Sequence, residues 1–196
     1  MSDRFAYFYQ PLKEFDLRRC VSEWSAVGVT LFNPSNQLVT SLSEDGSQIR
    51  TSLKELEDWF NSSRTLIFQL WLSDDTDLLC RIRIIDEDIL VEQYGLDGLY
   101  PTELKRVTDI LVGKFTRKAI SQVHDLFLIV DSEGYTIDLN WDLLAKAGRY
   151  EGNYCPDALG IPLSRRPDFD QCLERDVVTR VGEYLIAIKA IRVEME

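Results

Sequence analysis

Residues 65–94 read TLIFQLWLSDDTDLLCRIRIIDEDILVEQY, and this stretch decides the fold class. It contains three segments rich in leucine, isoleucine and aromatic residues, separated by two short acidic turns: 65–72, 77–85 and 89–94. In the second segment Cys80, Ile82 and Ile84 alternate with arginines, a pattern typical of a half-buried antiparallel strand. The first segment has apolar residues on both faces, including Ile67 and Trp71, which predicts a strand covered on both sides. Three consecutive strands with short turns predict an antiparallel meander.

Helical patterns flank this meander. The apolar residues between positions 17 and 24 recur at i, i+3, i+4 and i+7, which predicts an amphipathic helix over 12–25. The spacing of Ser52 and Glu55 forms a capping box and predicts a helix that starts there. Pro101 opens the longest helical pattern, which has basic residues near its end. A shorter helix is expected from Trp141 to a glycine at position 148.

Further strands are expected in hairpins and near the N-terminus. The segments are 5–9, the hairpin 27–32 with 38–42, and the hairpin 126–131 with 135–139. A polar loop is predicted over 43–50, and a long loop over about 149–166 precedes a predicted C-terminal helix over about 167–192. A strand is the alternative for 185–195. The mixture of hairpins and helices predicts one α+β domain over residues 1–196, with a mostly antiparallel sheet packed by several helices.

The chain is acidic, with 33 acidic and 22 basic side chains among 196 residues and a net charge of −11. This balance argues against binding to nucleic acid or to an anionic membrane, because both interactions need basic residues. Residues 51–100 hold 11 acidic and four basic side chains, so most of the excess lies in and around the meander. The chain has no apolar stretch of the roughly 20 residues that a membrane span needs.

The cysteines are scattered and lack a Cys-x-x-Cys pair, which argues against a disulfide framework and against zinc. We expect Cys20, Cys80 and Cys172 to be small buried apolar residues, whereas Cys155 lies in the long loop. Together with the absence of a secretory signal, this pattern predicts a cytoplasmic protein.

Motifs for catalysis are missing from the sequence. It has neither a glycine-rich phosphate loop nor a Gly-x-Ser-x-Gly elbow. His124 is the single histidine, and its place after a helical pattern predicts that it caps the C-terminal end of that helix. We therefore expect no catalytic residues, no metal and no cofactor, and we expect that the protein is not an enzyme.

The excess carboxylates gather in the two turns of the meander. Asp74, Asp75 and Asp77 lie in the first turn, and Asp86, Glu87 and Asp88 lie in the second. Consecutive turns of a meander lie at opposite ends of a sheet, so these groups do not predict one metal site. They are either solvated turn residues or a charged surface that attracts a basic protein partner.

The long loop contains tyrosines among arginines, a combination enriched at protein interfaces. Tyr150 and Tyr154 therefore either pack on the body of the protein or contact a partner. We name them, with the six acidic turn residues, as candidate partner-binding residues.

In composition the chain resembles the immunity proteins that bacteria pair with toxins, which are small, acidic α+β proteins without catalytic motifs. The resemblance covers no specific residue. It implies a non-enzymatic protein that neutralises a basic toxin domain by occluding its active site. One alternative is a carboxylate-based small-molecule-binding domain or enzyme that uses Asp131 and Asp138 beside Trp141 and Tyr135. A second is an adaptor or structural subunit that docks through the C-terminal helix. The sequence does not indicate the oligomeric state.

Overall fold

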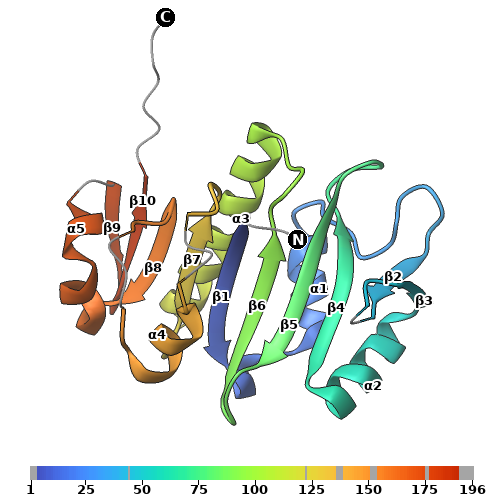
Figure 1. Ribbon diagram of the computed structural model, residues 1–196, viewed down its shortest axis with the longest axis horizontal. Helices are drawn as coiled ribbons and strands as arrows, with labels where there is room; N and C mark the ends of the chain where they lie inside the picture. The colour runs from blue at the N-terminus through green and yellow to red at the C-terminus, as the bar shows by residue number, and fades with distance from the viewer. Residues whose placement is uncertain are drawn as a thin grey trace, which may run out of the picture.

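An antiparallel sheet runs through the whole protein in the computed structural model, which describes residues 4–43, 45–121, 123–135, 139–150, 154–174 and 177–189. The described residues form ten strands in the order β3-β2-β4-β5-β6-β1-β7-β8-β10-β9 (Figure 1). The strands are β1 (Phe5–Pro11), β2 (Val39–Leu42), β3 (Gln48–Thr51), β4 (Thr65–Trp71), β5 (Asp77–Ile84), β6 (Ile89–Gly95), β7 (Phe127–Asp131), β8 (Ala158–Pro162), β9 (Val177–Val181) and β10 (Tyr184–Ile188). The prediction of an α+β fold with a mostly antiparallel sheet is confirmed.

The helices lie on both faces of the sheet but cover them unequally. One face packs against α1 (Leu17–Ser25), α2 (Leu53–Ser63) and α3 (Pro101–Ile120); α1 and α3 lie behind the strands in Figure 1, and α2 lies at the edge beside β4. The other face contacts α4 (Trp141–Ala147), the 3-10 helix η2 (Leu163–Phe169) and α5 (Asp170–Leu173) at its C-terminal half. No helix in the described ranges has the length and apolar character to cross a membrane.

The predicted meander is confirmed. It consists of β4, β5 and β6, which pair in sequence with the register Phe68 to Cys80 and Cys80 to Tyr94. The first strand of the chain, β1, lies between β6 and β7, so that Phe8 pairs with Glu92 on one side and with Leu128 on the other. The N-terminal strand therefore joins the meander to the C-terminal strands in one continuous sheet.

The helix-start signals are confirmed for the most part. In α2, the Ser52 side chain accepts a bond from the Glu55 backbone N–H (3.3 Å), and the Ser52 backbone N–H donates to the Glu55 carboxylate (2.8 Å). The helix α3 starts at Pro101 as expected. The start predicted for α1 was too early, because Asp16 caps the helix and residues 12–14 form a separate turn of 3-10 helix.

The first predicted hairpin is wrong. Residues 27–32 contribute only an isolated bridge from Thr30 to Trp71 within the described part of the chain. The strand β2 pairs instead with β3, which lies where a loop was predicted over 43–50, and with β4. The polar, exposed composition of β3 hid it, since the strand has no buried face that would give an apolar alternation.

The second predicted hairpin, 126–131 with 135–139, is also wrong. Both edges of β7 are paired with other strands, one with β1 and the other with β8, so residues 135–139 cannot pair with β7. The Asp131 carboxylate instead accepts bonds from the backbone N–H groups of Glu133, Gly134 and Tyr135 in the turn that follows β7. Residues 136–138 lie outside the described residues.

The predicted C-terminal helix over about 167–192 is wrong. The segment instead contains the end of η2, then α5, β9 and β10, while β8 lies inside the predicted loop of 149–166. Gly182 has a φ of 56°, which suits the tight turn between β9 and β10. Residues 184–187 in β10 are all buried, so this strand lacks the alternation that separates a strand from a buried helix in the sequence.

The prediction that the cysteines form no disulfide is wrong for one pair. Cys155 and Cys172 are joined by a disulfide that links the segment after α4 to α5. Cys172 is buried as expected, but as half of this bond. Cys20 and Cys80 are free and buried, as predicted.

Candidate protein-binding surface

Half of one sheet face lacks a helical cover within the described residues. The side chains of β4 alternate regularly between buried and partly exposed; the partly exposed set includes Ile67 and Trp71, although the indole nitrogen of Trp71 is buried. The prediction that this strand is covered on both faces is therefore wrong. The strands β4, β5, β6 and β1 lie at the front of Figure 1, with α1 and α3 behind them.

We call this region the open face and define it by seven partly or fully exposed residues of these four strands that face away from α1 and α3. The open face consists of Phe5, Ile67, Gln69, Trp71, Leu79, Arg81 and Gln93. Its apolar members belong to neither of the two clusters of the hydrophobic core.

The sheet register places the open-face side chains in rows. One row runs from Ile67 through Arg81 and Gln93 to Tyr7, across four adjacent strands; Tyr7, at the end of the row, packs against the core and is not part of the open face. In the adjoining positions Gln69 lies opposite Leu79, and Trp71 lies opposite Asp77. Strands in a sheet are spaced about 4.8 Å apart, so the four-strand row presents a surface about 14 Å wide on a rigid backbone.

The acidic residues of the first turn adjoin the open face. Asp77 accepts a hydrogen bond from the Gln69 side chain (2.9 Å), which links the turn to the face. Asp74 and Asp75 are exposed in the turn between β4 and β5. A hydrogen bond from the Ser73 hydroxyl (2.7 Å) lowers the pKa of Asp75, which extends to lower pH the range in which this carboxylate is charged.

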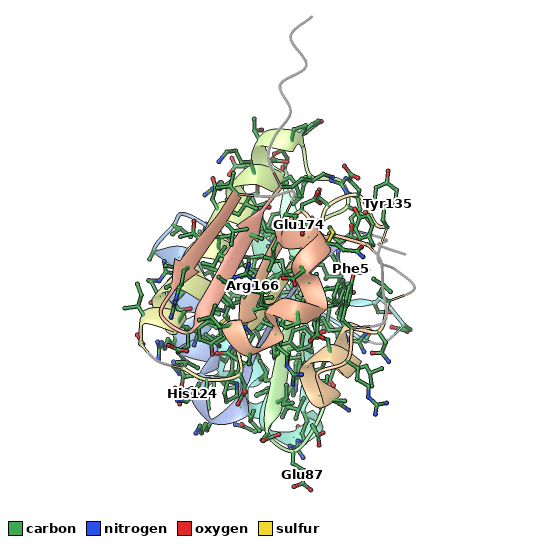
Figure 2. All side chains as sticks on the ribbon, turned by 90° about the vertical axis from the view of Figure 1, so that its left-hand side faces the viewer. Phe5, Glu87, His124, Tyr135, Arg166 and Glu174 are labelled. Carbon is green, nitrogen blue, oxygen red and sulfur yellow. A yellow bond between two sulfur atoms is a disulfide. The ribbon has the colours of Figure 1, made fainter. Side chains whose placement is uncertain are left out.

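The acidic residues of the second turn lie elsewhere. Asp86, Glu87 and Asp88 are exposed between β5 and β6, at the opposite end of the sheet. Figure 2 shows Glu87 at the bottom of the molecule, while Phe5 and Tyr135 lie toward the top. The two acidic turns therefore do not form one surface, and only the first adjoins the apolar residues of the open face.

The two tyrosines of the long loop have different surroundings. Tyr150 is half-buried and stacks between Trp141 (5.5 Å between ring centroids) and Phe169 (4.4 Å). Its hydroxyl donates to the backbone carbonyl of Tyr154. Tyr154 contacts the exposed ring of Tyr135 (5.2 Å), although its own hydroxyl is buried without a partner among the described residues. Packing within the protein therefore explains why a tyrosine stands at position 150. Tyr154, in contrast, lies beside an exposed aromatic residue, Tyr135.

Three residues of the carboxylate alternative are described, and their surroundings differ. The Asp131 carboxylate accepts bonds from backbone N–H groups, Trp141 is buried as the first residue of α4, and Tyr135 is exposed. Asp138 lies outside the described residues. Within the described ranges, no group of three or more histidine, cysteine or acidic side chains gathers in a way that could hold a metal ion.

His124 is exposed and does not cap α3. The helix ends at Ile120, and the turn that follows it is closed by the Val123 backbone N–H, which donates to the Lys118 carbonyl (3.1 Å). Figure 2 shows His124 on the lower part of the molecule, away from Phe5 and Tyr135.

A buried charged cluster lies under the other face of the sheet, and sequence reasoning missed it. The Lys114 ammonium donates to both carboxylate oxygens of Glu92 (2.6 and 2.7 Å), and both side chains are buried. Glu92 also accepts bonds from Gln10 (2.6 Å), from the Cys20 thiol (3.2 Å) and from the Tyr94 hydroxyl. The sequence did indicate this cluster, because Glu92 interrupts an apolar strand and Lys114 lies on the apolar side of α3.

Electrostatic compensation keeps this cluster ionised. Burial is the largest effect and by itself would raise the pKa of Glu92, but the charge of Lys114 and the hydrogen bonds from Lys114, Tyr94 and Cys20 together outweigh burial, and the pKa is lowered. The space beside the cluster is only about 10 Å³, about the size of one water molecule. The cluster is therefore a structural element of the core and leaves no room for a substrate.

A second ion pair anchors α4 to the sheet. The guanidinium of Arg83 bonds both carboxylate oxygens of Asp142 (2.6 and 2.9 Å), and the Tyr9 hydroxyl donates to the same carboxylate (2.9 Å). Burial and the charge of Asp142 raise the pKa of Tyr9, so its hydroxyl remains protonated. This cluster forms one boundary of the open face, where the covered half of the sheet begins.

Comparisons with known protein families, with curated proteins and with solved structures find no match to this chain or its fold.

Proposed function

We propose that this chain is a non-enzymatic protein-binding module that contacts a basic protein partner through the open face. One observation carries the proposal: aromatic, aliphatic and arginine side chains lie partly exposed on four rigid strands, outside both core clusters. Tryptophan, tyrosine and arginine contribute most to binding at protein interfaces, and strands hold them in place at little entropic cost.

The charge of the protein favours a basic partner. Asp74, Asp75 and Asp77 lie next to the open face, and the chain has a net charge of −11. An acidic rim beside an apolar centre would attract a basic partner and orient it on the face. The partner in this proposal is a toxin whose basic active site the open face occludes, in the cytoplasm. The Cys155–Cys172 disulfide does not support a cytoplasmic location, since disulfides persist mainly in oxidising compartments.

The proposal is tested by capturing proteins from a lysate of the producing cell at about 0.05 M and about 0.5 M salt. The test variant Trp71→Ser/Leu79→Ser removes two apolar side chains from the open face. The control variant Ile120→Ser/Val177→Ser removes two exposed apolar side chains, at the end of α3 and in β9, far from the open face. We expect a basic protein that the wild type and the control retain and that the test variant loses. Truncation of a central interface residue costs about 2 kcal/mol or more, about 30-fold in affinity.

A second pair of variants tests the acidic rim. The first variant is Asp74→Asn/Asp75→Asn, and the second is Asp86→Asn/Glu87→Gln. Each removes two negative charges, at opposite ends of the sheet. We expect the first variant to slow association and reduce its dependence on salt, and the second to have little effect. The proposal is overturned if no partner is retained at either salt concentration, or if the open-face variant retains the same partner as the wild type.

A further inference from the structure

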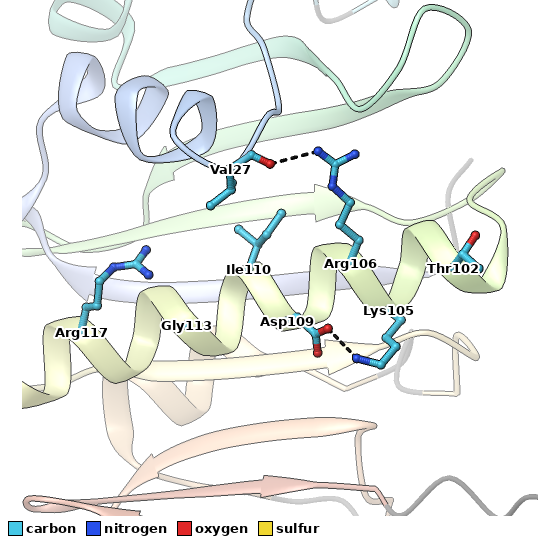
Figure 3. A pocket seen from close by; sticks show the side chains of 8 residues that line it. All are labelled: Val27, Thr102, Lys105, Arg106, Asp109, Ile110, Gly113 and Arg117. Carbon is cyan, nitrogen blue, oxygen red and sulfur yellow. Dashed lines mark hydrogen bonds and ion pairs between the residues drawn. The ribbon is translucent and has the colours of Figure 1, made fainter.

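A groove runs along the outer side of α3, away from the open face, and it has a charge opposite to that of the whole protein. Its volume is about 440 Å³, and it lies between α3 and the turn after α1. Figure 3 shows the eight residues that line it. Val27 and Ile110 are its apolar lining, and Val27 is 38% exposed.

Basic side chains surround this apolar lining. Arg106 donates to the backbone carbonyls of Leu72 (3.1 Å), Val27 (3.0 Å) and Gly28 (3.0 Å), which fixes its guanidinium at one end of the groove. Arg117 is exposed at the other end, as Figure 3 shows. The third cation, Lys105, is paired with Asp109 (2.5 Å). The groove therefore has a net positive charge within a chain whose net charge is −11.

The lining residues of α3 form one stripe. Arg106, Ile110, Gly113 and Arg117 occupy positions i, i+4, i+7 and i+11, which lie on one side of an α-helix. At a rise of 1.5 Å per residue, the two arginines are separated by about 16 Å along the axis. This is the length of about three helical turns, with an arginine at each end and an apolar residue between them.

Gly113 is the residue that the fold itself does not explain. A glycine inside a helix costs about 1 kcal/mol relative to alanine. Gly113 does not have a positive φ, and an added Cβ would meet only the mobile end of the Arg117 side chain, at 3.4 Å, an ordinary contact. Neither backbone conformation nor internal packing requires glycine here. Its absent side chain instead lets an external backbone approach α3 closely.

We propose that this groove binds an α-helix of a protein partner, with acidic side chains on either side of an apolar stripe. Such a helix would lie along α3, cross it closely at Gly113, place apolar side chains against Ile110 and Val27, and pair its carboxylates with Arg106 and Arg117. Helix-in-groove recognition uses this arrangement of apolar anchors. The charge of the groove selects an acidic helix, so this site and the open face take partners of opposite charge.

The experiment uses the full chain and a fluorescein-labelled 18-residue peptide, designed as an amphipathic helix with a leucine stripe flanked by glutamates. A second peptide has lysine in place of each glutamate. Binding is measured by fluorescence anisotropy, and thermal unfolding is measured on the same samples. We expect the glutamate peptide to bind the wild type and the lysine peptide to bind at least tenfold more weakly.

Variants of Gly113 distinguish binding from folding. Gly113→Ala is expected to raise Tm, because alanine favours the helix, and yet to weaken peptide binding about fivefold or more; Gly113→Leu should abolish binding. Arg117→Glu should weaken binding about tenfold. Its matched control, Arg50→Glu on the exposed strand β3, makes the same charge change at a distance and should alter affinity less than twofold.

Three results would each overturn the inference. They are no binding of the glutamate peptide at about 1 mM, equal binding of the lysine peptide, and affinity unchanged in Gly113→Leu or Arg117→Glu. Because the Trp71→Ser/Leu79→Ser variant leaves the groove intact, it should bind the peptide as the wild type does. The groove and the open face can therefore fail independently.

Discussion

Replacement of Lys114 by methionine tests the buried cluster most directly. The substitution keeps a long, unbranched apolar side chain, but it removes the ammonium, which lies 4.8 Å over the Phe8 ring and donates to both oxygens of Glu92. Glu92 is fully buried and would remain without its counter-ion. Removal of one partner from a buried ion pair costs about 3–5 kcal/mol. In a chain of this length, this corresponds to a decrease in Tm of about 10 °C.

The pH dependence of this variant has a defined sign. In the wild type the pKa of Glu92 is lowered, so its contribution to stability is present above the unfolded pKa of about 4.3 and is lost as the pH falls through the folded value. In Lys114→Met, burial acts without the ammonium and raises the pKa of Glu92 above its unfolded value. Stability in the variant is then lost as the pH rises. The difference in free energy of unfolding should therefore be larger at pH 8 than at pH 5.

The assay is urea unfolding monitored by tryptophan fluorescence at both pH values. The control Lys105→Met makes the same substitution at an exposed position of α3 and should cost no more than about 0.5 kcal/mol. The double variant Glu92→Gln/Lys114→Met removes both charges, so it should recover part of the stability and lose the pH dependence. A Lys114→Met protein within about 1 kcal/mol of the wild type, or one equally destabilised at both pH values, would refute the reasoning.

Two other expectations concern packing and the disulfide. Gly160→Ala should lower the free energy of unfolding by about 1–3 kcal/mol, because the added Cβ would lie 2.8 Å from the Phe115 ring; Gly113→Ala, with no such contact, is the control in the same thermal-unfolding assay. A thiol assay of the unreduced, denatured protein should count two thiols of four, and all four after reduction. Reduction of the Cys155–Cys172 bond, which closes a separation of 17 residues, should cost about 3 kcal/mol. A count of four thiols before reduction would contradict the disulfide.

Local signals predicted the elements that have a single buried face. Cys80, Ile82 and Ile84 alternate with arginines in the sequence, and β5 is a half-buried strand. The capping box at Ser52 and the proline at position 101 marked helix starts, because they satisfy or avoid backbone N–H groups within a few residues. Such interactions are local and can be read without knowledge of the rest of the chain.

The candidate site was predicted only in part. The sequence predicted the acidic turn at Asp74 and Asp75 and the strand β4 that precedes it. It also predicted that Trp71 and Ile67 are buried under a second layer, whereas both are partly exposed. A partly exposed aromatic residue and a buried one look alike in a sequence. Whether a helix covers that face depends on where α4 and α5 pack, and they contact the other half of the sheet.

The sequence by itself determined the α+β class, the meander from β4 to β6, and the helices α2 and α3, because periodicity and caps act within short segments. Only the tertiary structure decided the position of β1 between β6 and β7, the strands β8 to β10, and the pairing of Glu92 with Lys114. Each of these depends on partners far apart in the chain. The residues of β10 are buried on both faces, so their apolar run fits a helix as well as a strand until its neighbours in the sheet are known.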